Sequence, residues 1–256
     1  MRFHIFLSIL IFPILLGTSC HKDKKGKVEI NFTHTVDGES VHFNQLIYTN
    51  EAGNSYQINE IKYFISRIIF IDQIGKSFEI IQDDGIHYVD CSLENTLRWK
   101  IDEIPQGNYV AISFVFGLDE KDNISNRFLN PPESNFSWPN HLGGGYHYMQ
   151  INGFFLNQEG NISSMTIHTG IGQVYDGSAE NTEFVNNYFT VTLPVEFFVN
   201  NDNTPAFTLN MEIQRWFDTP NLYNFDDYGT GIMQNQTAQQ LLKENGGDVF
   251  DIMISN

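Results

Sequence analysis

The sequence predicts an all-β protein, an antiparallel β-sandwich of Greek-key or immunoglobulin-like type with a long loop and a short C-terminal helix. Three observations support this fold class. Aromatic and β-branched residues recur in short runs, glycine, asparagine and aspartate separate these runs, and helical periodicity is almost missing until the end of the chain. Such a pattern is typical of strands joined by turns.

The first nineteen residues have the pattern of an export signal. Arg2 precedes an apolar stretch over residues 5–16, and small residues follow at 17–19. This stretch is too short to span a bilayer comfortably. We therefore expect residues 1–19 to be a signal peptide that the mature protein lacks.

Cys20 follows the small residues, as in the lipobox of bacterial lipoproteins, although Gly17 stands where leucine is commoner. We expect a lipid on Cys20 to anchor the chain to a membrane, since several acyl chains on one residue give stable binding. The polar run over 20–26 is expected to be a flexible tether. The alternative is an ordinary secretory signal that ends at Cys20.

The first strand is predicted over residues 28–36. Val28, Ile30, Phe32 and Val36 share one phase of an alternating pattern, and polar residues occupy most of the other phase. One face of this strand should therefore be buried. His34 falls in the apolar phase, so we expect it to face inward near the end of the strand.

Further strands are predicted wherever apolar runs lie between turn residues. Their ranges are 41–49, 61–71, 77–82, 86–91, 109–116, 146–156, 163–169, 188–197 and 206–217, with a closing strand over 248–254. A helix is predicted over 237–243, since Asn245 and two glycines follow it as a stop signal.

One domain is expected over residues 27–256, because no stretch inside it has the composition of a linker and no internal repeat is visible. The irregular stretch 117–145 is long for a loop in a compact domain, which favours a functional role. It contains Trp138, His141 and three successive glycines at 143–145.

Charge and cysteine content exclude several classes of protein. The formal net charge of −17 makes nucleic acid an unfavourable partner. Only two cysteines are present, which excludes a disulfide framework if Cys20 is lipidated. Cys91 lies in a strand-like run and is expected to be a small buried residue, with a role as nucleophile or copper ligand as the alternative.

Histidines are the strongest candidates for chemistry. His34, His147 and His168 lie in predicted strands, and His141 lies in the long loop as a further candidate ligand. A hairpin turn at residues 157–160 would place Met149 directly opposite His168, with His147 one diagonal step away on the same face. Each histidine taken alone is more often a hydrogen-bonded core residue than a ligand.

This histidine and methionine arrangement favours copper. A thioether between two imidazoles is a soft ligand that suits reduced copper, whereas calcium requires clusters of oxygen ligands. His34 would supply a third nitrogen if its strand neighboured the hairpin. No nucleophile elbow, zinc-protease motif or phosphate-binding loop is present in the sequence, so we expect no enzyme.

A series of short motifs runs through most of the chain. They are IKYFIS at 61–66, IPQGNY at 104–109, FGLD at 116–119, WP at 138–139, GGYHY at 144–148, ING at 151–153, HTG at 168–170, WFDTPN at 216–221 and NGGDVF at 245–250. In this order they resemble the MbnP-like proteins, exported copper-binding proteins related to copper-repressed surface proteins of methane-oxidising bacteria.

The resemblance implies a copper site built from histidines. In some relatives a tryptophan, oxidised to kynurenine by a partner di-haem peroxidase-like protein, also takes part. Trp138 resembles that tryptophan, and His147 and His168 resemble the histidines of the family. Some relatives carry two tryptophans before the Gly-Tyr pair, whereas Trp138 stands alone here. The alternative role for Trp138 is to pin the long loop onto the sandwich.

Two functions follow as hypotheses. The first is a copper-binding lipoprotein of the bacterial cell envelope that captures or stores copper, most simply on the outer membrane and facing the periplasm or the cell surface. The second is a non-enzymatic interaction module in which Phe136, Trp138, Tyr146 and Tyr148 contact a glycan or a partner protein. An electron-transfer accessory would need a second redox centre, and the sequence has no haem-attachment motif.

Overall fold

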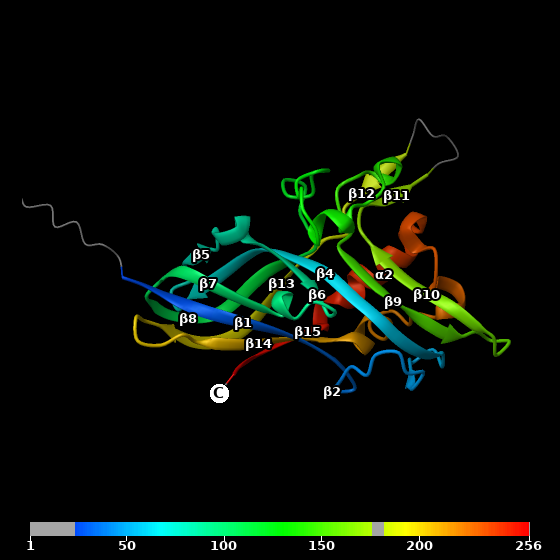
Figure 1. Cartoon of the computed structure of the whole chain (residues 1–256), viewed down its shortest axis with the longest axis horizontal. Helices are drawn as coiled ribbons and strands as arrows, with labels where there is room; N and C mark the ends of the chain where they lie inside the picture. The colour runs from blue at the N-terminus through cyan, green and yellow to red at the C-terminus, as the bar shows by residue number, and fades with distance from the viewer. Residues whose placement is uncertain (1–23, 176–181, 256) are drawn as a thin grey trace, which may run out of the picture.

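The computed structural model describes residues 24–175 and 182–255. The fold is mostly β-sheet, with two packed sheets and a helical region near the C-terminus, as predicted (Figure 1). The predicted signal peptide over 1–19 and the lipidation site Cys20 lie outside the described residues. Among those residues, none of the helices combines the length and apolar composition needed to cross a membrane.

The first sheet is built around the N-terminal strand β1 (Lys25–Val36). Its other strands are β2 (Glu39–Ser40), β7 (Arg98–Pro105), β14 (Ala206–Glu212) and β15 (Phe250–Ile254). The pair β1–β14 is parallel, a difference from the fully antiparallel arrangement that we expected. Lys25 and Gly26 pair with β7, so the strand already begins inside the tether predicted over 20–26.

The second sheet has the long strand β4 (Ser55–Asp72) as its spine. Around it lie β3 (Tyr48–Thr49), β5 (Ser77–Glu79), β6 (Ile86–Asp90), β8 (Gly107–Phe116), β9 (Met149–Leu156), β10 (Ile162–Thr169) and β13 (Phe189–Val199). The path β10-β9-β4-β8-β13 runs across the sheet. Figure 1 shows the β9–β10 hairpin at the end of the molecule opposite the start of β1.

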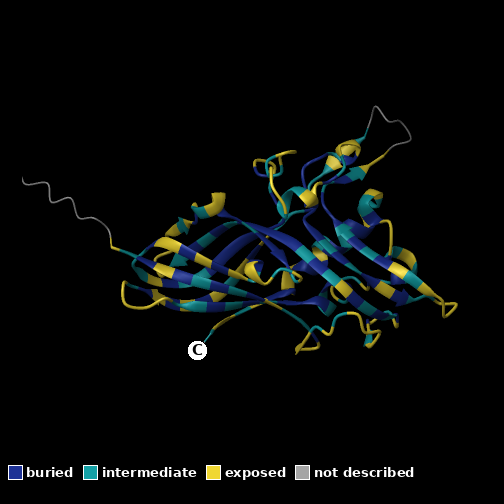
Figure 2. Ribbon diagram, in the orientation of Figure 1, coloured by how far each residue is buried: buried dark blue, intermediate teal, exposed yellow. Residues whose placement is uncertain are grey.

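The alternation in β1 explains why the sheets pack. Val28, Ile30, Phe32 and Val36 are buried as predicted, and they meet apolar side chains of the second sheet in one core. Figure 2 shows buried and exposed residues alternating along the strands. Burial of this apolar surface is the main free energy that holds the two sheets together.

The C-terminal helix forms where the sequence predicts it. α2 spans Gln236–Asn245; the side chain of Asn235 accepts a hydrogen bond from the Ala238 amide at its start, and Gly246 follows its end. Ala238 and Leu242 lie in the core. The remaining small elements are the hairpin β11 (Gly172–Val174) and β12 (Glu183–Val185), and the short helix α1 (Phe225–Tyr228).

Several parts of the chain differ from the strand predictions. The predicted strand 206–217 ends at Glu212, where a 3-10 helix over Ile213–Phe217 follows, and the short strands β11 and β12 were not predicted. Residues 41–49 form a strand only at Tyr48–Thr49; His42 and residues 44–47 are exposed, so this run buries too little apolar surface to form a sheet strand. Strand β7 was missed because its alternation breaks. Ile101 and Ile104 are both buried although three positions apart, and Glu103 between them has a φ of 62°.

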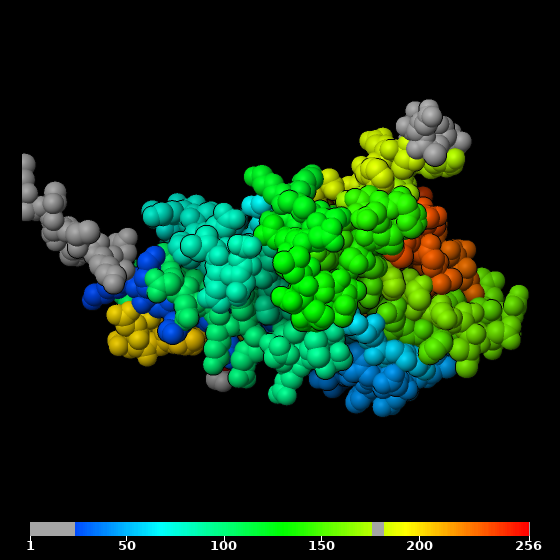
Figure 3. Space-filling model, turned by 45° about the horizontal axis from the view of Figure 1, so that its top comes forward, coloured from blue at the N-terminus to red at the C-terminus, as the bar shows by residue number. Residues whose placement is uncertain are grey.

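The long irregular stretch after β8 covers the outer face of the second sheet. Residues 117–148 contain no strand apart from one isolated bridge, and two short 3-10 helices lie within them, Glu133–Phe136 and Asn140–Leu142. Figure 3 shows the green atoms of this part of the chain gathered on one face of the molecule. A small second core forms there, in which Phe64 of β4 contacts Phe136.

Candidate metal centre

His147 and His168 lie together beneath the long loop. His168 is near the end of β10, and His147 lies two residues before β9, its hairpin partner. The centres of the two imidazole rings are 5.2 Å apart with planes at 82°. Two imidazoles that bind one ion at about 2.0–2.1 Å have ring centres roughly 5–6 Å apart. The observed distance between the ring centres lies within this range.

Hydrogen bonds use one nitrogen of each ring. Nδ1 of His147 lies 3.0 Å from the carbonyl oxygen of Phe136, to which it donates, and the His147 backbone amide donates to the same oxygen at 2.9 Å. Nε2 of His168 lies 2.8 Å from Oδ1 of Asn152. These bonds leave Nε2 of His147 and Nδ1 of His168 as the nitrogens whose lone pairs are available to an ion.

Burial keeps both rings in the form that binds metals. It lowers the pKa of His147 to about 4, against the opposing effect of hydrogen bonds to the backbone of Phe136 and Ser137. Burial also lowers the pKa of His168 to about 4, although the nearby carboxylate of Glu60 acts in the opposite direction. Both imidazoles are thus neutral at pH 7, so an ion would not have to displace a proton from them.

Four buried or half-buried histidines should make the free protein sensitive to acid. Burial is the largest cause that lowers the pKa of His34, His87, His147 and His168 from 6.5 to about 4. Between these two pH values the unfolded chain binds more protons, so the free energy of unfolding should fall as the pH decreases from 6.5 to 4. Urea titrations across this range measure the slope. His87→Gln should make the slope of unfolding free energy against pH shallower. An unchanged slope in that variant would show that the His87 imidazole does not contribute to the acid sensitivity.

Trp138 packs against the histidine pair. The indole is buried, and its centre lies 4.7 Å from that of the His147 ring, edge to face. Its Nε1 donates a hydrogen bond to the carbonyl of Leu142 at 2.9 Å. Gly170 leaves room for the ring, because a Cβ at this position would lie 2.7 Å from the indole. The unmodified indole nitrogen carries a proton and offers no lone pair to an ion.

Met149 does not lie between the imidazoles, and the predicted register was wrong by one residue. Met149 pairs with Thr169, and His168 pairs with Gln150. The hairpin loop is one residue longer than expected, because the Asn157 amide donates to the carbonyl of Asn161. A shift of one residue moves a side chain to the other face of a sheet. Met149 is consequently in the core, fully buried.

His34 also lies apart from the pair. It faces inward as predicted, but β1 belongs to the other sheet and does not neighbour the β9–β10 hairpin. Its Nε2 lies 3.2 Å from the Tyr63 hydroxyl and its Nδ1 lies 3.3 Å from Sγ of Cys91. Tyr63 faces the core, whereas His168 is on the opposite face of the same sheet. Within the described residues, no three His, Cys, Asp or Glu side chains form a metal-binding group.

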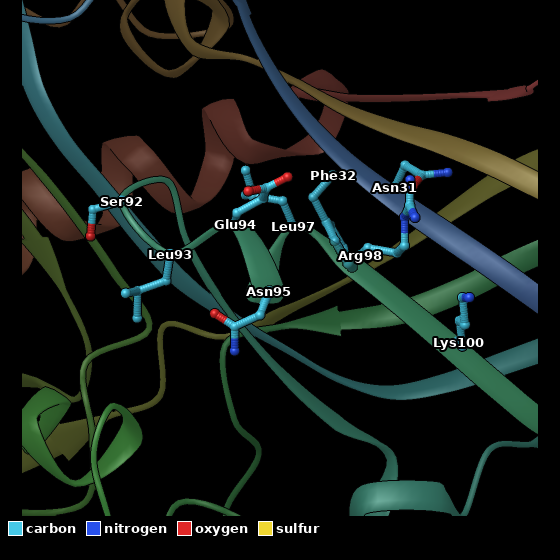
Figure 4. A pocket seen from close by; sticks show the side chains of 9 residues that line it. All are labelled: Asn31, Phe32, Ser92, Leu93, Glu94, Asn95, Leu97, Arg98 and Lys100. Carbon is cyan, nitrogen blue, oxygen red and sulfur yellow. The ribbon is translucent and has the colours of Figure 1, made fainter.

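The remaining candidates are separate from the pair. His141 is exposed in the short helix Asn140–Leu142 and makes no ring contact with the two imidazoles in the described part of the chain. Burial raises the pKa of the Cys91 thiol to about 12, so it is not an activated nucleophile. A surface hollow of about 1000 Å³ contains Asn31, Glu94 and Arg98, and no histidine lines it (Figure 4).

The aromatic side chains of the loop region are buried and form no solvent-exposed binding surface. Phe136, Trp138, Tyr146 and Tyr148 are each 1–2% exposed. Apart from Trp138, they pack around Phe64 in the second core. The structure therefore contradicts the hypothesis that these four side chains contact a glycan or a partner, because ligands bind aromatics that water can reach.

Sequence reasoning missed the residues that orient the imidazoles. The side chain of Asn152 in β9 is hydrogen-bonded to His168, and it also donates a hydrogen bond to Glu60 of β4. The available signal was the alternation of Glu60 and Lys62 with buried neighbours in an otherwise apolar strand. Polar side chains that repeat at this period mark the outer face of β4, on which the site lies.

Comparisons with known proteins agree with the motifs. The family model MbnP matches residues 25–234. The solved structure of MbnP from Methylosinus trichosporium aligns with 91% of this chain and 100% of its own, at a TM-score of 0.57 and 16% sequence identity. No curated protein matches. At this identity the structural likeness shows a shared fold, while the family model covers most of the chain.

Proposed function

The chain belongs to the MbnP family, and from that premise we propose that it binds copper outside the cytoplasm, for capture or storage, through His147 and His168. The observation that carries the proposal is the convergence of two neutral imidazoles whose ring centres are 5.2 Å apart. Coordination without turnover is the mechanism, so the protein is not an enzyme.

The available donor atoms fit copper better than zinc or calcium. Structural zinc sites almost always have four protein ligands, and catalytic zinc sites have three. Here two imidazoles converge, and no third His, Cys, Asp or Glu joins them in the described residues. Calcium requires six to eight oxygen ligands. Copper(II) binds nitrogen ligands more tightly than zinc does in the Irving–Williams order, so two imidazoles favour copper.

The surroundings of the pair would keep a bound ion away from bulk water. His147 is 7% exposed, and Phe136 and Trp138 pack against its ring. The family resemblance implies that some members add a kynurenine, made from tryptophan, to their histidines, and the contact of Trp138 with the His147 ring supports such a role here. We propose a di-haem peroxidase-like protein as the partner that oxidises Trp138, because the indole itself has no free lone pair.

The predicted export signal and the candidate lipidation site Cys20 support a location in the cell envelope. We propose a lipid-anchored protein, held through Cys20 on the outer membrane, that faces the periplasm or the cell surface. The formal charge of −17 supports the attraction of cations and disfavours nucleic acid as a partner.

Copper retention tests the proposal directly. The protein is freed of metal, incubated with excess copper, washed by gel filtration, and assayed for copper per chain. We expect about one equivalent to be retained at pH 7, where both imidazoles are neutral. Parallel samples with zinc and calcium serve as controls and should retain little. Copper below about a tenth of an equivalent would refute the proposal, because a single intact site should be nearly filled in excess metal.

A further inference from the structure

A row of polar side chains runs beside His168 on the outer face of the second sheet. In the register of the strands, Glu60 of β4 pairs with Asn152 of β9, while Lys62 and Gln150 pair in the adjacent row that leads to His168. Asn152 is therefore one diagonal step from His168 on the same face. At this spacing a side-chain amide reaches an imidazole nitrogen.

The hydrogen bonds in this row have only one consistent direction. Oε2 of Glu60 is 2.8 Å from Nδ2 of Asn152, and a carboxylate accepts, so the amide group donates to it. The other end of the same amide, Oδ1, lies 2.8 Å from Nε2 of His168. An amide oxygen carries no hydrogen, so His168 donates. The proton of the neutral ring is thereby on Nε2, and the lone pair is on Nδ1.

Lys62 holds the carboxylate in this orientation. Its Nζ contacts Oε1 of Glu60, which leaves Oε2 as the oxygen that faces Asn152. Asp90 is a second, more distant partner of the same ammonium at 3.8 Å. The row thus begins in an ion pair on β4 and ends at the imidazole on β10, across three adjacent strands.

We propose that Glu60, acting through Asn152, is a positioning residue that sets the tautomer of His168 and so presents its Nδ1 to a bound ion. This inference rests on the proposed copper site at His147 and His168. His147 has the opposite tautomer, because its Nδ1 donates a hydrogen bond to the Phe136 carbonyl and its Nε2 keeps the lone pair that can bind an ion. The two histidines therefore contribute different nitrogens, one selected by the backbone and the other by a side-chain relay.

The relay can be removed without removal of a ligand. Asn152→Leu preserves the approximate volume of the side chain and deletes both hydrogen bonds, so nothing favours one tautomer of His168. Gln150→Leu is the matched control. Gln150 lies on β9, as Asn152 does, directly opposite His168 of β10, and it forms no side-chain hydrogen bond with the ring in the described residues. Glu60→Gln is an intermediate case, because a glutamine amide can either accept from Asn152 or donate to it.

Two measurements test the inference. Nitrogen-15 NMR of the imidazole groups in the metal-free protein reports which nitrogen of His168 is protonated. We expect Nε2 in the wild type and in Gln150→Leu, and a mixture of tautomers in Asn152→Leu. Copper competition titrations should show affinity about 10–100-fold weaker in Asn152→Leu, the usual effect of the loss of an outer hydrogen-bond partner. Gln150→Leu should remain within about twofold of the wild type, which is the scatter expected for a residue without such a bond.

The outcomes separate this inference from the copper proposal. A wild-type His168 protonated on Nδ1 overturns the relay whatever the protein binds. An Asn152→Leu variant with the wild-type tautomer and wild-type affinity overturns it as well. If the wild type retains no copper while Asn152→Leu still changes the tautomer, the relay is supported and the proposed function fails. Equal urea midpoints of the two leucine variants show that unfolding does not cause the difference.

Discussion

Simultaneous replacement of His147 and His168 by alanine is expected to abolish copper retention. Each substitution removes one of the two neighbouring imidazoles, and the described residues offer no third His, Cys, Asp or Glu near them to compensate. Either single variant should weaken binding by more than about 100-fold, because loss of a ligand exceeds the effect of loss of its hydrogen-bond partner. Copper per chain after gel filtration, together with competition titrations, measures both effects.

His141→Ala is the matched control for these variants. His141 is exposed on the same loop region and has no ring contact with the pair among the described residues, so its loss should leave copper retention unchanged. Retention of one equivalent by the double variant would show that the ion binds elsewhere. Loss of copper in His141→Ala would show that the loop carries a ligand, as the sequence alone also allowed.

Trp138→Ala is expected to lower the free energy of unfolding by about 3–5 kcal/mol, the usual cost of replacing a buried large aromatic residue by alanine. The indole is 2% exposed, packs on Gly170 and donates to the Leu142 carbonyl, which the variant leaves without this donor. Urea unfolding at pH 7 measures the change. A change below about 1 kcal/mol would mean that the loop collapses onto the vacated space or does not pack there.

Trp138→Phe separates the two roles considered for this residue. Phenylalanine fills much of the same space, so the variant should regain most of the stability that alanine loses. If Trp138 only pins the loop, Trp138→Phe should also retain copper like the wild type. If an oxidised Trp138 is a ligand in protein produced with its partner, copper affinity should fall in Trp138→Phe although the protein remains stable.

Local patterns in the sequence predicted much of this fold. The alternation of Val28, Ile30 and Phe32 identified β1, and Asn245 with its following glycines marked the end of α2. These features depend on neighbours a few residues away, so they are visible in the chain itself. The family resemblance, drawn from the order of short motifs, is confirmed by the family model over residues 25–234.

Elements that depend on distant partners were predicted less well. The break in the alternation of β7 between Ile101 and Ile104 concealed a strand that forms because β1 lies beside it. In residues 41–49, Val41, Phe43 and Tyr48 pack partly against the core, whereas 42 and 44–47 are exposed, so most of the run does not pair with a sheet. The pairing of β1 with β14 brings together segments more than 170 residues apart, and no local pattern shows that the pair is parallel.

For the candidate site, the sequence by itself determined that His147 and His168 belong to one hairpin, because turn residues and alternation are local properties. Only the tertiary structure decided which other side chains join them. One additional loop residue moved Met149 to the core face, and the assignment of β1 to the other sheet separated His34 from the pair. The tertiary structure also decided which nitrogen each imidazole presents, since that depends on the hydrogen bonds that the rings donate to the Phe136 carbonyl and to Oδ1 of Asn152. The physical reason is that these partners lie on neighbouring segments of backbone, whose placement depends on the packing of the whole domain.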